Sequence, residues 1–208
     1  LDSGASAQKP EVVISAMADL MRHSYANVHR GLHTLANETT ERYENAREKV
    51  ANFIGATSSE IVFTRGATEA LNLVAAGLGQ GLAEGDEVLL TEMEHHANIV
   101  PWHFLRERKG VVLRFAPLRP DGGLDMEALE GLLSPRTRVV SVVHMSNVLG
   151  TVNPVRRIAE LARAAGAVCV VDACQSVVHG QLDVHALGAD FVAFSGHKLY
   201  GPTGIGVL

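Results

Sequence analysis

The sequence predicts an α/β fold built on a seven-stranded, mostly parallel sheet with helices on both faces. Beyond residue 60, short apolar runs rich in valine, leucine and phenylalanine alternate with segments of helical periodicity. Continuous apolar strands that alternate with helices are typical of a parallel sheet covered on both faces. The link between the last two apolar runs is about ten residues long and rich in glycine, which is too short for a helical crossover. The last strand is therefore predicted to be antiparallel.

Two helices are predicted before the sheet begins. The first spans residues 11–25, where apolar side chains recur at helical spacing after Pro10. The second spans residues 39–54 and stops at Gly55, a residue type that often follows a helix. We therefore expect an N-terminal helical segment, residues 1–58, that packs on a larger domain of residues 59–208.

The predicted elements of the larger domain follow one another in regular alternation. The strands are expected at residues 61–64, 87–91, 111–116, 139–145, 168–172, 191–195 and 205–208. Between most of them lie helices, at residues 68–77, 98–108, 125–133 and 155–165, the last preceded by Pro154.

Composition excludes several classes of protein. The 208 residues are 47% hydrophobic and 20% charged, as in a globular chain, with a formal net charge of −5. Lysines and arginines are scattered, which argues against a nucleic-acid partner. No apolar run approaches the roughly 20 residues of a membrane helix, so no membrane partner is expected. The two cysteines, Cys169 and Cys174, fit no zinc or redox spacing and favour a reducing, cytoplasmic compartment.

Polar residues with chemical potential follow the predicted strands. Lys198 comes just after the apolar run 191–195, and ligands of open α/β sheets bind outside the carboxyl ends of the strands. A partly desolvated lysine amine can form a Schiff base with an aldehyde, whereas the alternative is a surface lysine that closes a strand. Asp172 ends another apolar run, where a carboxylate requires a positive partner such as a protonated heterocycle, an arginine or a helix N-terminus. One strand–helix–strand unit separates Asp172 from Lys198, so their strand ends are predicted to be neighbours.

Three other strand ends carry candidate ligand-binding groups. Thr68 lies in a glycine-containing turn that opens a helix, which predicts either a phosphate seat or an ordinary helix cap. His95 could lie on a flat aromatic ligand, shuttle protons or be a loop histidine. The pair His95 and His96 does not predict a metal site, because no third metal ligand follows at a suitable spacing. Asn147 is an amide at the rim of the sheet, or a turn residue. An aldehyde-capturing lysine, a buried aspartate, a phosphate seat and a ring-facing histidine together are what pyridoxal phosphate requires.

At these residues the sequence resembles the class V aminotransferase family of fold-type I pyridoxal-phosphate enzymes, and most of all the SufS-type (group II) cysteine desulfurases. The run 195–206, Ser-Gly-His-Lys-Leu-Tyr-Gly-Pro-Thr-Gly-Ile-Gly, is the most specific match. Segment 94–102 indicates group II rather than group I. The other matching segments are 1–10, 28–34, 65–72, 93–102, 146–150 and 171–175. The resemblance implies that the chain forms the large, cofactor-binding domain of this fold.

The resemblance also implies a set of roles. Lys198 would hold the cofactor as a Schiff base and act as acid and base, His95 would stack on the ring and assist proton transfer, and Asp172 would pair with the ring nitrogen. Five other residues would contact the cofactor: Gln175 and Asn147 on the ring's oxygen side, and Thr68, Ser195 and His197 at the phosphate. The family converts L-cysteine to L-alanine and passes the sulfur, as an enzyme persulfide, to an acceptor protein for iron–sulfur cluster assembly. No metal is implied.

Three features set expectations for the rest of the protein. The family's nucleophilic cysteine and its arginine for the substrate carboxylate are expected beyond Leu208, in a C-terminal small domain. Because the first residue is not methionine and the last ones lie in a predicted strand, we expect a piece of a longer protein, a homodimer at full length. On its own the 208-residue piece is expected to be inactive and to bind the cofactor weakly or not at all. Cys174 replaces the family's usual small residue and is expected to be core filler.

The alternatives share the fold and differ in the reaction. A selenocysteine lyase, an amino-acid epimerase or an aminotransferase of class V would use the same cofactor site. An inactive truncated product, or a binding protein that keeps the fold, would use none of it. A nicotinamide site is not indicated, because the glycines at residues 77–81 lack the required spacing and follow a helix.

Overall fold

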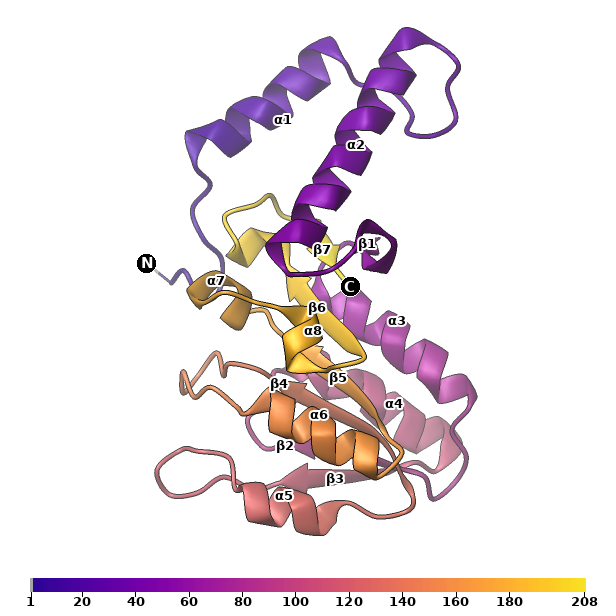
Figure 1. The fold of residues 1–208 in the computed structure, drawn as a ribbon, viewed down its shortest axis with the longest axis vertical. Coiled ribbons are helices and arrows are strands. Elements are labelled where there is room, and N and C mark those ends of the chain that lie inside the picture. Colours follow the sequence, from indigo (N-terminus) through magenta and orange to yellow (C-terminus); the bar gives the residue numbers. More distant parts are fainter. Residues whose placement is uncertain (1) are drawn as a thin grey trace.

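The computed structural model describes residues 2–208 as an open sheet flanked by helices, with the first helix and most of the second extending beyond the sheet (Figure 1). The strands are β1 (Phe63–Thr64), β2 (Glu87–Thr91), β3 (Val112–Ala116), β4 (Thr137–Val143), β5 (Val168–Asp172), β6 (Phe191–Ser195) and β7 (Gly206–Val207). The α-helices are α1 (Glu11–His23), α2 (Thr34–Phe53), α3 (Ala67–Gln80), α4 (Val100–Lys109), α5 (Met126–Leu132), α6 (Val155–Ala164), α7 (Ser176–His179) and α8 (Val184–Leu187). Short 3-10 helices are η1 (Ser58–Glu60), η2 (His96–Asn98) and η3 (Gly196–Lys198).

The sheet has the strand order β1-β7-β6-β5-β4-β2-β3. Strands β2 to β6 are all parallel to one another, whereas β7 is antiparallel to both β6 and β1. The predicted seven-stranded, mostly parallel sheet with an antiparallel last strand is confirmed. Because β1 and β6 are both antiparallel to β7, they run in the same direction and end at the same edge of the sheet. The start of α3, which follows β1, therefore lies beside the end of β6.

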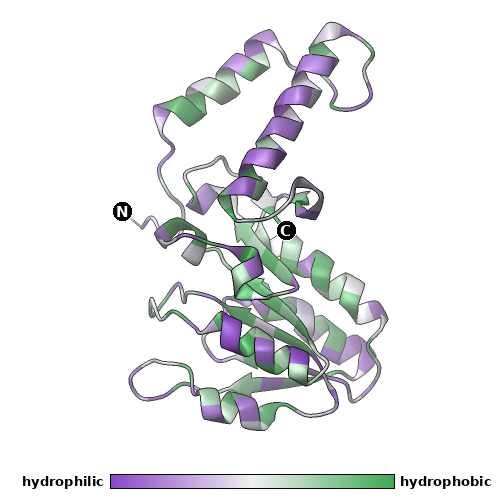
Figure 2. Cartoon of the chain, in the orientation of Figure 1, coloured by the Kyte–Doolittle hydropathy of each residue, from purple (hydrophilic) through white to green (hydrophobic). Residues whose placement is uncertain are grey.

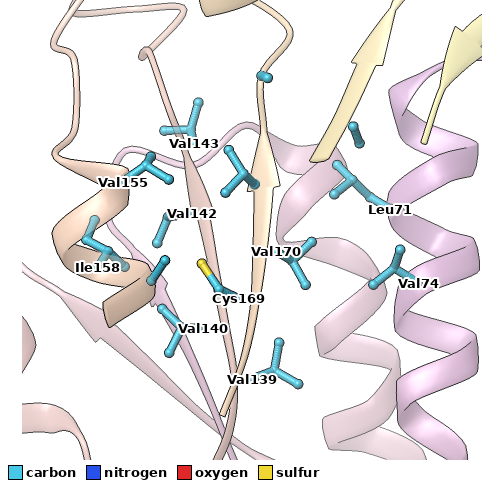
Figure 3. Packing of buried hydrophobic residues seen from close by; sticks show 14 of the residues in the cluster. Leu71, Val74, Val139, Val140, Val142, Val143, Val155, Ile158, Cys169 and Val170 are labelled. Carbon is cyan, nitrogen blue, oxygen red and sulfur yellow. The ribbon is translucent and has the colours of Figure 1, made fainter. Parts of the chain in front are cut away.

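The core lies between the sheet and the helices on its two faces. In Figure 3 the buried valines of β4 and β5 lie between Val155 and Ile158 of α6 on one side and Leu71 and Val74 of α3 on the other. All of these side chains are almost completely buried. Burial of each such side chain contributes about 1.5–3 kcal/mol, so packing on both faces holds β4 and β5 between the helices.

The N-terminal helices make few buried contacts within the described chain. Helix α1 buries none of its residues, and Figure 2 shows α2 as largely hydrophilic. The C-terminal half of α2 is held to the sheet by Arg47, which donates to the Ile61 carbonyl at 2.6 Å and lies over the rings of Tyr43 and Phe63. The division into residues 1–58 and 59–208 stays a prediction.

Several element boundaries differ from those predicted. Helix α2 begins at Thr34 rather than at residue 39, because the His33 ring accepts the Ala36 N–H and caps the extra turn. Histidine is not among the usual capping residues, so the sequence pattern misses this start. The one-turn helices α7 and α8 are too short to show a periodic pattern. Among the described helices, none is long and apolar enough to cross a membrane.

Gly206 allows β7 to pack directly against the turn that begins α3. It pairs with Thr64 of β1 and with Ser195 of β6. A Cβ atom at position 206 would lie 2.4 Å from the Gly66 Cα and 2.6 Å from the Gly66 carbonyl carbon. Both are backbone atoms, which cannot rotate away as a side chain can.

Gly206→Ala is therefore expected to destabilise the full-length protein by about 3 kcal/mol, because overpacking against backbone forces the strand and the helix start apart. Urea unfolding of the cofactor-free protein measures the change. Gly77→Ala is the matched control: it lies within α3, and a Cβ there meets nothing within 4 Å. The control is expected to be neutral or slightly stabilising. Equal effects of the two substitutions would contradict this account of Gly206.

Candidate active site

A cavity of about 320 Å³ opens at the carboxyl edge of the sheet. Seven of the eight residues that the sequence singles out line it: Thr68, His95, Asn147, Asp172, Ser195, His197 and Lys198. They come from the ends of β2, β4, β5 and β6 and from the start of α3. The eighth, Gln175, lies close by, where its side-chain amide donates to the Gly4 carbonyl at 2.8 Å.

Asp172 and Lys198 lie at the ends of adjacent parallel strands, as predicted. Strand β5 pairs with β6, with Asp172 opposite Ala193, and Lys198 follows β6 in η3. The Asp172 side chain is buried, and its Oδ1 accepts the Cys174 N–H at 3.0 Å. Among residues 2–208, Oδ2 of Asp172 and the Lys198 amine have no hydrogen-bond or salt-bridge partner. A carboxylate and an amine thus face one cavity without pairing with each other.

The start of α3 provides hydrogen-bond donors at the same cavity. The Ser195 hydroxyl oxygen accepts the Ala67 N–H at 2.8 Å, and the Ala70 N–H bonds to the Gly66 carbonyl. Within the described chain the N–H groups of Thr68 and Glu69 have no partner. Free amides at the positive end of a helix dipole favour an anion.

His95 lies at the cavity on the turn that follows β2. It caps η2, because its Nδ1 accepts the Ala97 N–H at 3.1 Å. This hydrogen bond requires an unprotonated Nδ1, so the ring proton is on Nε2. Partial burial lowers the pKa of His95, and the nearby positive charge of Lys198 lowers it further, while Asp172 acts in the opposite direction. The ring is thus neutral at neutral pH and presents a flat face or an N–H donor.

The ring of His95 is expected to titrate below the ordinary histidine pKa of about 6.5. NMR titration of the cofactor-free, full-length protein measures it. Removal of the positive charge by Lys198→Ala is expected to raise this pKa, since a cation disfavours protonation, and Asp172→Asn is expected to lower it. A titration at or above 6.5, or one that neither substitution moves, would show that His95 does not share a cavity with these charges.

Residues 2–9, here called the N-terminal strap, form one wall of the cavity. No single residue of this segment indicates such a position. Asp2, Gly4 and Ala5 line the cavity. The strap is attached at His197, whose carbonyl accepts the Ala7 N–H at 3.0 Å and the Lys9 ammonium at 3.1 Å. The only signal for it in the sequence is the family-like segment 1–10, of which Leu1 lies outside the described residues.

Both cysteines are buried and unpaired. Burial raises the pKa of Cys169 to about 12 and that of Cys174 still further. Cys174 borders the cavity, with its Sγ 4.0 Å from the Ser195 Oγ. Because the thiolate is the nucleophile, neither thiol is suited to attack at neutral pH. The expectation that Cys174 is a buried residue is confirmed.

A second cavity of similar size, about 310 Å³, lies at the other edge of the sheet, between α8, β6 and the end of α2. It is lined mainly by apolar side chains, with Glu60, His185 and Asp190 at its margin. None of its lining residues is a lysine, so it offers no amine to an aldehyde. The chemistry of the lining residues therefore identifies the first cavity as the candidate site.

Comparison with known proteins agrees with this arrangement. The sequence model of the family "Aminotransferase class-V" matches residues 1–208. A cysteine desulfurase of Klebsiella pneumoniae is 55% identical over 210 residues, which cover 100% of this chain and 52% of that protein. A probable cysteine desulfurase of Halalkalibacterium halodurans is 53% identical with the same coverage. The chain thus spans about half the length of the curated relatives it matches.

Solved structures show the same likeness in three dimensions. The apo structure of a cysteine desulfurase from Thermococcus onnurineus superposes with a TM-score of 0.95 at 43% identity, covering 99% of this chain and 52% of that one. The Escherichia coli cysteine desulfurase CsdA gives a TM-score of 0.91 at 44% identity, covering 100% and 52%. Fold, cavity and sequence agree, and the chain belongs to the class-V aminotransferase family.

Proposed function

We propose that this chain is the cofactor-binding part of a pyridoxal-phosphate-dependent cysteine desulfurase, which converts L-cysteine to L-alanine and passes the sulfur on as a persulfide. The observation that carries the proposal is the unpaired Lys198 amine and the unpaired Asp172 oxygen at one cavity, on neighbouring strand ends. The names of the relatives support the choice of reaction. The group II subtype rests on the resemblance of residues 94–102.

The residues at the cavity fit pyridoxal phosphate. An aldehyde requires a free amine, and Lys198 has one without a competing partner in the described chain. A phosphate requires donors, and the N–H groups of Thr68 and Glu69 are free at the start of α3, near Ser195 and His197. A protonated ring nitrogen requires a buried anion, and Asp172 keeps one oxygen toward the cavity. A volume of about 320 Å³ lies in the range of small-molecule sites.

When bound, pyridoxal phosphate supplies an electron-accepting ring that stabilises negative charge at the substrate's α-carbon. In this chain, Asp172 would hold the proton at the ring nitrogen, because its burial strengthens the ion pair. Lys198 would hold the cofactor's aldehyde carbon through its amine and would move protons at the substrate's α-carbon. His95 would lie against the ring and, with its proton on Nε2, donate toward the substrate. Asn147 would contact the ring's oxygen.

The sulfur-accepting cysteine is not one of the two in this chain. Cys169 lies in the core of β5, and Cys174 is a buried thiol whose raised pKa keeps it protonated. We therefore place the persulfide-forming cysteine, and the arginine that binds the substrate carboxylate, outside residues 1–208.

Gln175 would act through the strap, since its amide donates to the Gly4 carbonyl.

The proposal extends to partners and location. We infer a homodimer at full length, supported by the exposed apolar side chains of α1 and of the segment that follows it, among them Val12, Met21 and Tyr25. Analytical ultracentrifugation of the full-length protein tests this, and a monomer at micromolar concentration would contradict it.

A sulfur-acceptor protein of iron–sulfur assembly and a cytoplasmic location complete the proposal. The two unpaired cysteines support a reducing compartment.

The full-length protein, loaded with pyridoxal phosphate and given L-cysteine and a thiol reductant, is expected to release alanine and sulfide in equal amounts. Amino-acid analysis and a sulfide assay measure the two products. Transfer of the amino group to a keto acid without alanine would indicate an aminotransferase. Activity on selenocysteine alone would indicate a selenocysteine lyase, and racemisation of an amino acid would indicate an epimerase.

A further inference from the structure

A buried polar cluster lies behind His95, and none of the functions above uses it. Its centre is Glu94, which precedes His95 on the turn of residues 92–98. The carboxylate accepts three hydrogen bonds: the Thr91 hydroxyl at 2.5 Å, the Val143 N–H at 2.9 Å and the Asn98 side-chain amide at 2.7 Å. We call Glu94, Thr91, Asn98, Ser141 and Trp102 the Glu94 cluster.

The far side of the cluster is equally complete. The side-chain amide oxygen of Asn98, Oδ1, accepts the Ser141 hydroxyl at 2.5 Å and the Trp102 indole N–H at 3.4 Å. Thr91, Asn98, Ser141 and Trp102 are 0% exposed, and Glu94 is 8% exposed. A network of this kind in a low-dielectric interior holds its members in one arrangement, because any unpaired donor would be costly.

The cluster connects the turn that carries His95 to the middle of the sheet. Thr91 is the last residue of β2, and Asn98 is the last residue of η2, so Glu94 closes the turn on itself. Its bond to the Val143 N–H joins the turn to β4, at the position that pairs with Asp172 of β5. The Glu94 carboxylate, together with the bond from Ser141 to Asn98, therefore holds the turn of His95 on β4, the strand next to the one that carries Asp172.

Only an acceptor with two oxygens satisfies these contacts. Three donors converge on Glu94, and a glutamine would present an N–H₂ group to the Asn98 amide, which is itself a donor here. Burial raises the pKa of Glu94 to about 7, although its hydrogen bonds oppose the shift. Burying the Glu94 carboxylate costs free energy of folding, and its three hydrogen bonds offset that cost. The carboxylate is therefore better explained by the arrangement it imposes on the turn than by a gain in stability.

We propose that Glu94 is a positioning residue: its carboxylate holds the 92–98 turn on β4 and so sets the orientation of the His95 ring at the cavity. The inference rests on the proposed function for its catalytic consequence, and on the geometry of the cluster alone for the placement of His95.

The test compares four variants of the full-length protein: Glu94→Gln, Asn98→Asp, the double variant that carries both, and Glu92→Gln. The double variant reverses one hydrogen bond, since the new glutamine amide would donate to the new aspartate, whose other oxygen still accepts from Ser141 and Trp102. Glu94→Gln alone sets two donors against each other, and Asn98→Asp alone places a second buried acid beside Glu94, so that the two acids must share one proton. Glu92 is exposed on the same turn, so its replacement is the control.

Three readouts are used: kcat and KM for cysteine, circular dichroism in the absorption band of bound pyridoxal phosphate, and the NMR titration of His95 without cofactor. Each single variant is expected to lower kcat on the order of 10- to 100-fold, to change the dichroism and to shift the His95 titration. The double variant is expected to recover most of each, and Glu92→Gln to match the unmodified protein.

A purely structural role predicts something else. Single variants would then unfold more easily in urea, yet their folded, cofactor-loaded fraction would keep the kcat, dichroism and His95 titration of the unmodified protein, and the proposal would be wrong. Failure of the double variant to restore the His95 titration would also overturn it. If the unmodified protein makes no alanine, the proposed function fails, whereas the His95 titrations still decide the role of Glu94.

Discussion

Replacement of Lys198 with alanine is expected to abolish both the visible absorption band of the bound cofactor and the release of alanine from cysteine. No other amine lines the cavity of the described chain, so no other lining residue could form the link to the cofactor's aldehyde. Loss of a group that forms a covalent bond to the reacting system costs several orders of magnitude in rate. Absorption spectroscopy and product analysis of the full-length protein measure the two effects.

Two companion variants separate the amine from the charge of Lys198. Lys198→Arg keeps a positive charge but cannot form the link, so it is expected to be as inactive as Lys198→Ala. Lys49→Ala removes an exposed lysine of α2 and is expected to behave as the unmodified protein. If Lys198→Ala retained the band and turned over cysteine, Lys198 would not be the cofactor's lysine.

Asp172→Asn is expected to lower kcat/KM for cysteine on the order of a thousandfold. The substitution preserves size and retains an oxygen that can accept the Cys174 N–H, so the local fold is expected to persist. What it removes is a buried negative charge, and the loss of one partner of a buried ion pair typically costs about 3–5 kcal/mol. Without that charge the residue at position 172 would no longer hold a proton at the ring nitrogen, and the bound ring would be a weaker electron acceptor.

The measurement is steady-state kinetics at matched cofactor occupancy, with occupancy read from absorbance. Asp172→Ala is expected to be at least as impaired, since the Cys174 N–H also loses its acceptor. Asp183→Asn, on the exposed N-cap of α8 and away from the cavity, provides a carboxylate control that is expected to affect stability alone. An Asp172→Asn variant within tenfold of the unmodified protein would contradict the assigned role.

The sheet and its active edge could be predicted because they depend on strong local patterns. The apolar runs that form β2, β5 and β6 were bounded correctly at both ends, since each stops abruptly at a polar residue. Once the sheet is parallel, the ends of neighbouring strands must meet at one edge, so Asp172 and Lys198 converge by topology alone.

What the sequence could not predict depends on contacts between distant segments. The strap is held at the cavity by the Ala7 N–H and the Lys9 ammonium, which both donate to the His197 carbonyl about 190 residues away, and nothing in its composition indicates a partner. Gln175 carries no local sign that its amide is directed to Gly4. Glu94 looks like an ordinary loop carboxylate until Val143 and Ser141 of β4 are placed beside the turn.

The central claim is that one lysine of this chain binds the cofactor's aldehyde at the edge where Asp172 lies. The sequence contains four lysines, Lys9, Lys49, Lys109 and Lys198, and Lys9 is also near the cavity, with its ammonium on the His197 carbonyl. Borohydride reduction of the full-length protein loaded with pyridoxal phosphate, followed by digestion and mass spectrometry, identifies the lysine that carries the reduced link. The account predicts the added mass on Lys198 alone; its appearance on Lys9, or on no lysine of this chain, would contradict it.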